Sequence, residues 1–274
     1  MASKSSEGGV LDTIKTVVYA LLLAGIIRTL FFQPFYIPTG SMKPTLLIGD
    51  FLFVNKFAYG YSRHSCPFSL CPFDGRILFS EPERGDIAVF RHPVLRQDYI
   101  KRLVGLPGDT IQVTGGRLVI NGEMLPLEPA GTFDEPNIAQ RGAEPRCMGV
   151  VADGANCQKE RFVETLPDGT EHYVLNFQDG RQDETGIYTV PEDHYFFMGD
   201  NRDNSVDSRF FSRAQLNDNR DNLEGSIPFH PGGVGFVHRD FLLGKTNLVV
   251  FSAEGPSLFL LWNWRFDRLL EWVE

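Results

Sequence analysis

Apolar residues fill one N-terminal segment of this chain and return later in short alternating runs. The segment at 10–32 is almost wholly apolar, and its charges, Asp12, Lys15 and Arg28, lie near its two ends. Its uncharged part, 16–27, is shorter than the about 20 residues that cross a bilayer, but charged side chains near the ends of a span can extend to the lipid headgroups. A signal peptide, a buried helix and a single membrane span are all compatible with this pattern.

The residues that follow the uncharged part favour the membrane span. A cleavable signal peptide needs small residues after its apolar run, whereas this chain has Ile26-Ile27-Arg28-Thr29-Leu30-Phe31 there. We therefore expect one transmembrane helix at 10–32, after a cytoplasmic N-terminus at 1–9. Lys4 and Lys15 favour this orientation, because basic residues are enriched on the cytoplasmic side of membrane spans.

The pattern after residue 40 predicts a fold that is mainly β. Successive side chains of a strand point to opposite faces, so half-buried strands alternate apolar and polar residues. A strand at 110–120 and one at 123–125, joined by the turn Asn121-Gly122, predict a hairpin. Further strands are predicted at 50–56, 85–90, 98–104, 187–190, 194–198, 234–237 and 247–251. Together these segments define a β core in two parts, 33–125 and 187–254.

Two other segments differ from this core. Gly, Pro, Asp and Glu are frequent at 126–186, which indicates a polar β insertion subdomain with a few strands of its own, one of them at 172–176. At 255–274 the apolar residues recur at helical spacing and predict an amphipathic helix. That helix either packs on the domain or lies in a membrane interface, since Arg265 and Arg268 oppose a second span.

Composition narrows the range of partners. With 274 residues, 42% of them apolar and 22% charged, the chain can form one large or two moderate folded domains. The net charge of −9, without a basic cluster, excludes nucleic-acid binding. The four cysteines form two local pairs, Cys66/Cys71 and Cys147/Cys157, and no C-x-x-C motif. We expect two disulfides, formed in an oxidising compartment such as a periplasm, rather than a zinc site; four free thiols are the alternative.

Candidate chemistry concentrates in the stretch Ile37-Pro38-Thr39-Gly40-Ser41-Met42-Lys43-Pro44-Thr45-Leu46. Its prolines and glycine set the backbone while Thr39, Ser41 and Thr45 supply hydroxyls; a plain turn that enters a strand is the alternative. The chain has no G-x-S-x-G elbow, and Lys43 follows Ser41 by two residues, not by the three of a Ser-x-x-Lys motif. The six histidines are scattered without an i,i+4 pair, so we expect neither a metal site nor a cofactor.

A lysine could instead activate the serine. A lysine acts as a general base only when neutral, so its pKa must fall from about 10.4 to about 7–8, a change of about 4 kcal/mol that burial can supply. Lys101 is the best candidate, because strand alternation places it on the same face as Tyr99 and Leu103. A lysine that reaches solvent at a sheet edge is the alternative. Lys43, which follows the serine in a loop, is expected to be solvated.

Four stretches resemble the conserved boxes of bacterial type I signal peptidases, also called leader peptidases, and occur in the order of that family. They are Ile37–Leu46, Gly85–Phe90, Tyr99–Asp109 and Gly199–Arg209, and the last two match nearly residue for residue. The similarity extends over about 10–251, and the 126–186 insertion and the C-terminal tail are covered least. The resemblance implies a β catalytic domain anchored by the N-terminal helix.

The resemblance also implies roles for individual residues. Ser41 would be the nucleophile and Lys101 its base, and the Thr39 hydroxyl would form an oxyanion hole with the Ser41 amide. Many members have serine at the position of Thr39. Ser205 would hold the lysine amine, supported by an Asp207–Arg209 ion pair, for which an ordinary surface salt bridge is the alternative. The expected substrate pockets are lined by Ile37, Pro38, Met42, Leu46, Tyr99 and Ile100, and the expected structural residues are Asp200, Asn201 and Asn204.

The function implied is that of a membrane-bound serine endopeptidase. Such an enzyme removes N-terminal signal peptides from exported preproteins by cutting after small residues, as in Ala-x-Ala. It would be a single-pass protein of the bacterial inner membrane with its catalytic domain on the periplasmic side. Its partners would be preproteins and the phospholipid bilayer, and we expect a monomer. The alternatives are a self-cleaving, repressor-like protease and an inactive membrane-tethered β-domain that binds exported proteins.

Overall fold

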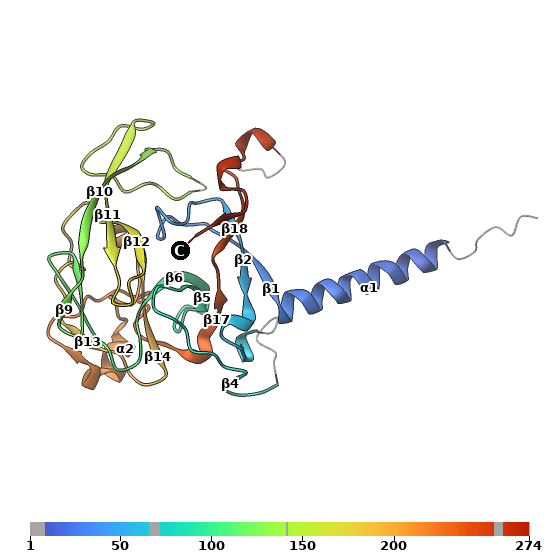
Figure 1. Ribbon diagram of the computed structural model, residues 1–274, viewed down its shortest axis with the longest axis horizontal. Helices are drawn as coiled ribbons and strands as arrows, with labels where there is room; N and C mark the ends of the chain where they lie inside the picture. Colours follow the sequence, from blue (N-terminus) through green and yellow to red (C-terminus); the bar gives the residue numbers. More distant parts are fainter. Residues whose placement is uncertain (1–8, 66–71, 141, 255–259, 274) are drawn as a thin grey trace, which may run out of the picture.

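The N-terminal helix stands apart from the rest of the molecule. The structure is a computed structural model and describes residues 9–65, 72–140, 142–254 and 260–273. Helix α1 (Gly9–Leu30) is long and apolar enough to cross a membrane, and none of its apolar stretch is buried by the protein. It projects away from the β-domain (Figure 1). The prediction of a helix is confirmed, although the chain already turns into a strand, β1 (Phe32–Tyr36), at Phe32.

The largest sheet carries the catalytic candidates and lies next to α1 (Figure 1). Its strands pair in the order β16-β14-β6-β5-β17-β2-β18-β19, with β1 paired to β2 beside that path, and all of its pairs are antiparallel. The strands predicted around 50–56, 85–90, 98–104, 194–198 and 247–251 are present, whereas of the strand predicted at 234–237 only Val237 is in a strand. The strands on this path are β2 (Asp50–Asn55), β5 (Ile87–Arg91), β6 (Asp98–Gly105), β14 (His194–Met198), β16 (Val237–His238), β17 (Leu242–Lys245), β18 (Leu248–Ser252) and β19 (Glu271–Trp272). Strands β17 and β19 were not predicted.

A second sheet of five short strands packs on the end of the first. Its order is β15 (Leu223–Glu224), β13 (Ile187–Thr189), β7 (Thr110–Thr114), β8 (Arg117–Ile120) and β9 (Glu123–Met124). The predicted turn at Asn121-Gly122 is confirmed. The single strand predicted at 110–120 is wrong, because Gly115 and Gly116 take the positive φ angles of a second tight turn there.

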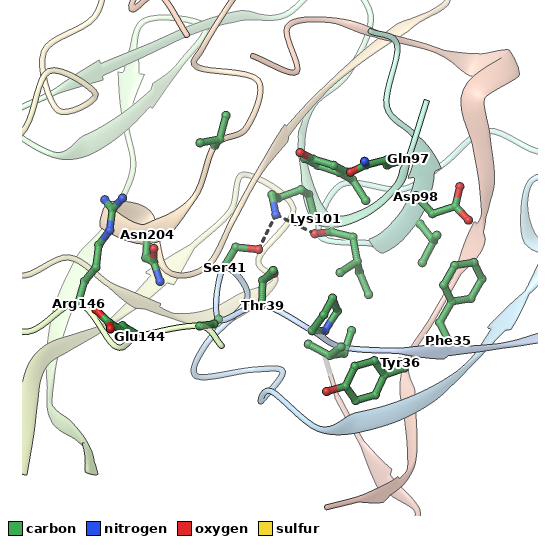
Figure 2. Close-up of a pocket in the computed structure, with 18 residues that line it drawn as sticks. Phe35, Tyr36, Thr39, Ser41, Gln97, Asp98, Lys101, Glu144, Arg146 and Asn204 are labelled. Atoms are coloured by element: carbon green, nitrogen blue, oxygen red, sulfur yellow. Dashed lines mark hydrogen bonds between the residues drawn. The ribbon is translucent and has the colours of Figure 1, made fainter. Parts of the chain in front are cut away.

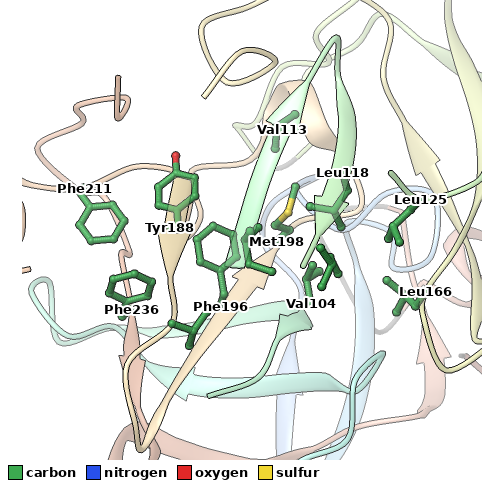
Figure 3. Packing of buried hydrophobic residues seen from close by; sticks show 13 residues of the cluster. Val104, Val113, Leu118, Leu125, Leu166, Tyr188, Phe196, Met198, Phe211 and Phe236 are labelled. Atoms are coloured by element: carbon green, nitrogen blue, oxygen red, sulfur yellow. The ribbon is translucent and has the colours of Figure 1, made fainter. Parts of the chain in front are cut away.

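The main apolar core lies between these two sheets (Figure 3). Its buried side chains come from both of them and include Val104, Val113, Leu118, Tyr188, Phe196, Met198, Phe211 and Phe236. Each large apolar side chain that is fully buried contributes about 1.5–3 kcal/mol relative to an exposed position. This core therefore holds β6, the strand that carries Lys101, in a fixed place.

The insertion forms a sheet of its own. Strands β10 (Leu127–Pro136), β11 (Asn156–Thr165) and β12 (Glu171–Leu175) pair in that order, and β12 confirms the strand predicted at 172–176. The loop 137–155 connects β10 to β11. The remaining short elements are β3 (Tyr61–Ser62), β4 (Arg76–Ile77), α2 (Arg213–Asp218) and the 3-10 turns Lys56–Ala58, Arg63–Ser65, Arg202–Asn204, Arg220–Asn222 and Arg239–Phe241.

The amphipathic helix predicted at 255–274 is wrong where the structure describes that segment. Residues 260–273 form two 3-10 turns, Leu261–Asn263 and Phe266–Arg268, followed by β19. The Arg268 guanidinium donates to Asp50 and to the Thr45 carbonyl, and β19 pairs with β18. These tertiary hydrogen bonds replace the local ones of a helix. Residues 255–259 and 274 of that prediction lie outside the described residues, as do residues 1–8 of the predicted cytoplasmic segment.

Candidate active site

Ser41 and Lys101 meet at the floor of a cleft (Figure 2). Ser41 lies in the loop that follows β1, and Lys101 lies in β6. The Lys101 amine donates to Ser41 Oγ at 2.6 Å and to the carbonyl of Ile100 at 3.1 Å. Both side chains are buried, Ser41 at 8% exposed and Lys101 at 4%. The lysine therefore does not extend to solvent at a sheet edge.

The surroundings of Lys101 favour the neutral amine. Burial lowers the pKa of Lys101 to about 8, against the charges of Asp207 and Asp200, which raise it; the Arg209 charge lowers it further. The amine also lies 5.6 Å from the centre of the Tyr99 ring, on the strand face that alternation predicts. At a pH near 8, a large fraction of the amine is thus free to accept a proton from the adjacent hydroxyl.

The cleft around this pair has a volume of about 560 Å³. Of the six residues expected to line substrate pockets, four belong to its wall: Ile37, Pro38, Tyr99 and Ile100. Met42 and Leu46 do not. They are 1% and 0% exposed and pack in an apolar cluster beneath the loop, with Leu52 and Val249 among others. They hold the loop in place from below.

Two hydrogen-bond donors beside Ser41 are free to bind a substrate oxygen. The Ser41 backbone N–H and the Thr39 hydroxyl make no hydrogen bond with any residue that the structure describes. Thr39 is exposed and lies beside Ser41 in the cleft (Figure 2). The positions of these groups suit an oxyanion hole.

Asp207 and Arg209 form a buried ion pair, so the alternative of a surface salt bridge is wrong. Arg209 Nε and Nη2 donate to the two carboxylate oxygens of Asp207, each at 2.9 Å, and the side chains are 1% and 0% exposed. Asp207 also accepts from the Gly199 N–H at 3.0 Å. Burial alone would raise the pKa of Asp207, but the Arg209 charge lowers it below the ordinary value.

Ser205 lies close to the site without holding the lysine. Its hydroxyl is buried and has no hydrogen-bond partner within the described part of the chain, and Lys101 donates elsewhere. Gly199 separates it from the nucleophile, since a Cβ at that position would lie 2.3 Å from Ser205 Oγ and 2.5 Å from the Ser41 carbonyl oxygen. Only glycine allows these groups to approach so closely.

The residues expected to be structural divide into two groups. Asp200 accepts from Arg102 Nε and Nη2, each at 2.9 Å, and from the Thr45 hydroxyl at 2.5 Å, so it joins β6 to the loop of Ser41. Asn201 donates to the carbonyls of Ser41 and Gly40 at 3.1 and 2.9 Å. Both are buried supports of that loop. Asn204, by contrast, is part of the cleft wall.

Lys43, two residues after the nucleophile, is buried rather than solvated. It was expected to be solvated, but it is 3% exposed and forms a buried ion pair with Glu135 of β10. Lys159 of β11 pairs with the other oxygen of Glu135. Burial lowers the pKa of Lys43, although Glu135 opposes that change. The prediction is wrong because the β10–β11 hairpin covers the loop, and nothing near Lys43 in the sequence indicates such a cover.

The insertion also supplies part of the cleft wall, which the sequence did not indicate. Ala143, Glu144 and Arg146, from the loop between β10 and β11, line the cleft. The adjacent Cys147 forms a disulfide with Cys157 at the start of β11, and this bond ties the loop to the sheet. The paired cysteines were the one sequence signal for a fixed loop here. The other pair, Cys66 and Cys71, lies outside the described residues.

The family model and the curated relatives identify one family. Residues 10–251 match the family described as signal peptidase, peptidase S26. The chain is 37% identical to signal peptidase I of Rickettsia typhi over 246 residues, which cover 86% of this chain and 78% of the relative. It is 40% identical to signal peptidase I of Rickettsia canadensis over 205 residues, 71% of each chain. A solved signal peptidase I from Enterococcus faecalis is 26% identical, covers 61% of this chain and 97% of its own, and has a TM-score of 0.28.

Proposed function

Since this chain belongs to the signal peptidase family, peptidase S26, it is a serine endopeptidase that removes signal peptides, and we propose that Ser41 and Lys101 carry out the reaction. One observation supports these roles above all. The Lys101 amine, buried and with its pKa lowered to about 8, lies 2.6 Å from the Ser41 hydroxyl on the floor of the cleft. A nucleophile within hydrogen-bond reach of a neutral base is the arrangement that acyl transfer requires.

The proposed reaction has two halves. In the first, neutral Lys101 takes the hydroxyl proton as Ser41 Oγ attacks the carbonyl carbon of the scissile bond. The Ser41 N–H and the Thr39 hydroxyl stabilise the oxyanion, and Lys101 returns the proton to the leaving nitrogen, which becomes the new N-terminus. In the second half, Lys101 accepts a proton from water as the water attacks the ester. Ser41 then leaves with that proton, and the signal peptide departs with a carboxyl end.

The buried polar residues around the pair act as positioning groups in this proposal. The Asp207–Arg209 ion pair fixes the Gly199 backbone, which packs between Ser205 and the Ser41 carbonyl. We propose that the Ser205 hydroxyl, buried and without a hydrogen-bond partner in the described part of the chain, accepts from the Lys101 amine once that amine has released Ser41.

The cleft wall supports a preference for small side chains before the cut. Ile37, Pro38, Tyr99 and Ile100 line the cleft next to Ser41 and make this part of its wall largely apolar. We propose that an extended substrate lies between the loop after β1 and strand β6, with Ala-x-Ala residues against these side chains. Larger side chains would clash with a wall that is already close-packed.

The N-terminal helix serves as the membrane anchor in this proposal. About ten residues separate the end of α1 from Ser41, a distance of at most roughly 35 Å in an extended chain. Exposed aromatic side chains gather at the base of α1, where Phe32 contacts Phe53 and Phe57. Aromatic residues favour the membrane–water interface. The enzyme would thus be a single-pass monomer of the bacterial inner membrane, with its disulfide-bonded domain in the periplasm, acting on exported preproteins.

A cleavage assay tests the proposed residues. We would incubate a purified preprotein with an Ala-x-Ala site with the detergent-solubilised full chain, with Ser41→Ala and with Lys101→Met, and follow the mature product by gel and mass. We expect cleavage after the second Ala by wild type and by neither variant, with both variants folded by circular dichroism. Near-normal cleavage by Lys101→Met would refute the assigned base. Binding without cleavage by wild type would instead favour the tethered binding domain.

A further inference from the structure

One wall of the cleft lies beyond the nucleophile and comes from the insertion loop. Figure 2 shows Glu144, Arg146 and Asn204 on one side of Ser41, and Phe35, Tyr36 and Asp98 on the other. The cleft is therefore longer than the part that holds residues before the cut. Its second half differs in carrying a guanidinium, that of Arg146.

Four connections hold the loop against the site. The disulfide between Cys147 and Cys157 closes it next to Arg146. Arg146 Nη1 donates to the carbonyl of Asp203 at 2.8 Å, in the segment that also carries Asn204. At its start the loop is fixed by the Lys43–Glu135 ion pair and by Gln140, whose side-chain oxygen lies 3.4 Å from Lys43 Nζ. The position of Arg146 relative to Ser41 is thus built into the fold.

The path of the substrate determines what this second half of the cleft contacts. Helix α1 continues directly into β1, which ends at Tyr36 beside the first half of the cleft. Under the proposed function, the signal peptide lies in the same bilayer as α1 and enters from that end. The residues after the scissile bond then leave past Asn204 and Arg146.

The charge of Arg146 is available to such residues. Its one described hydrogen bond goes to an uncharged carbonyl, and within the described chain no carboxylate forms an ion pair with it. Figure 2 shows its guanidinium pointing away from the Glu144 carboxylate. A guanidinium with free N–H groups on a cleft wall pairs well with a carboxylate, frequently through two parallel hydrogen bonds.

We propose that Arg146 selects substrates by their mature sequence: it pairs with an Asp or Glu side chain in the first few residues after the cut. This inference rests on the proposed function and adds a specificity determinant on the product side of the cleft. The preferred substrates are preproteins whose mature part begins with an acidic segment.

Matched substrates and a charge reversal test the proposal. We would prepare one preprotein with a fixed signal peptide and Ala-x-Ala site, and place Glu, Gln or Lys in turn at each of its first four mature positions. For the full chain in detergent, kcat/KM should be about threefold to fivefold higher with Glu than with Lys at one of these positions, as for an exposed ion pair. Arg146→Glu should reverse that order, and Arg146→Gln should remove it. Raising the salt concentration should reduce the preference, because salt screens exposed charges.

A matched control separates a local contact from a change in overall charge. Arg220→Glu alters net charge by the same amount at an exposed position that does not line the cleft, and it should keep the wild-type order. Equal rates for Glu and Lys substrates, or an unchanged order in Arg146→Glu, would refute the role of Arg146 and leave the proposed function intact. A wild-type preference for Lys would refute it as well and assign the wall to Glu144. No cleavage of any substrate, the Gln series included, would overturn the proposed function and this inference with it.

Discussion

Replacing Lys101 by Met should abolish cleavage and at the same time stabilise the folded domain. The pKa of this buried amine is held at about 8 rather than 10.5. Because a pKa shift of one unit corresponds to about 1.4 kcal/mol, keeping this lysine protonated in the folded state costs about 3 kcal/mol of folding free energy at neutral pH. Methionine has a similar length and no charge. The lost hydrogen bond to Ser41 offsets about 1 kcal/mol, which leaves a net gain of about 2 kcal/mol.

The gain should depend on pH in a defined direction. Below pH 8 both the folded and the unfolded wild type carry the proton, so the full penalty is present. Between about 8 and 10.5 only the unfolded chain binds it, and the stability of wild type rises with pH relative to the variant. Above 10.5 the penalty is gone, and Lys101→Met should be the less stable protein because it lacks the hydrogen bond.

Urea unfolding of the full chain in mild detergent, at pH 7 and pH 10, measures this difference. The three tryptophans, Trp262, Trp264 and Trp272, all lie in the C-terminal segment that packs on β18, so their emission reports its release. A gain of about 2 kcal/mol moves the midpoint by about 1 M. Lys245→Met is the control, since Lys245 is 34% exposed and pairs with Asp86, and its removal should not stabilise. An equal destabilisation by Lys101→Met at both pH values would refute the claim that burial lowers the pKa of this lysine.

Three further predictions concern the same loop and base. The kcat/KM for a preprotein should rise about tenfold per pH unit up to about pH 8 and then level off, because only neutral Lys101 accepts the proton; a flat profile from pH 6 to 8 would contradict this. Thr39→Val should lower kcat about 10²- to 10³-fold while Thr39→Ser stays active, and equal activity of the two would exclude the hydroxyl from the oxyanion hole. Glu135→Gln leaves Lys43 and Lys159 buried without a carboxylate and should lower the free energy of unfolding, measured in urea, by about 3–5 kcal/mol. Adding Lys43→Met to that variant should recover part of the lost stability.

Local patterns in the sequence were sufficient for the N-terminal helix and for most of the strands, whereas the proposed reacting pair also needed the family resemblance. A run of apolar residues from 10 to 32 specifies a helix wherever it lies, and a period of two specifies strands such as β7 and β8. Lys101 could be favoured over Lys43 as the base because Tyr99 and Leu103, which share its face of the strand, are apolar. The Asn121-Gly122 turn was predictable for the same reason, since its backbone requirement is met by the residues themselves.

Burial and pairing of loop residues depended on which distant segment packs over them. Met42 and Leu46 lie beneath the loop rather than in the cleft, because β2 and β18 supply an apolar floor there. The C-terminal segment is not helical, because Arg268 finds Asp50 across the sheet. A periodic pattern predicts that one face of an element is apolar, but it does not predict which segment packs on that face.

The sequence therefore determined that this protein has an apolar N-terminal helix and a β-domain, because local hydrophobic patterns specify both. The choice of Ser41 and Lys101 rested on the resemblance of their segments to signal peptidases, and only the structure brings the two side chains together. The tertiary structure alone decided that Lys43 is buried with Glu135, that the Asp207–Arg209 pair is internal and that Arg146 reaches the cleft. Those contacts join residues that are far apart in the chain or that other segments enclose. Their energies arise from desolvation and charge pairing, which exist only once the segments have packed together.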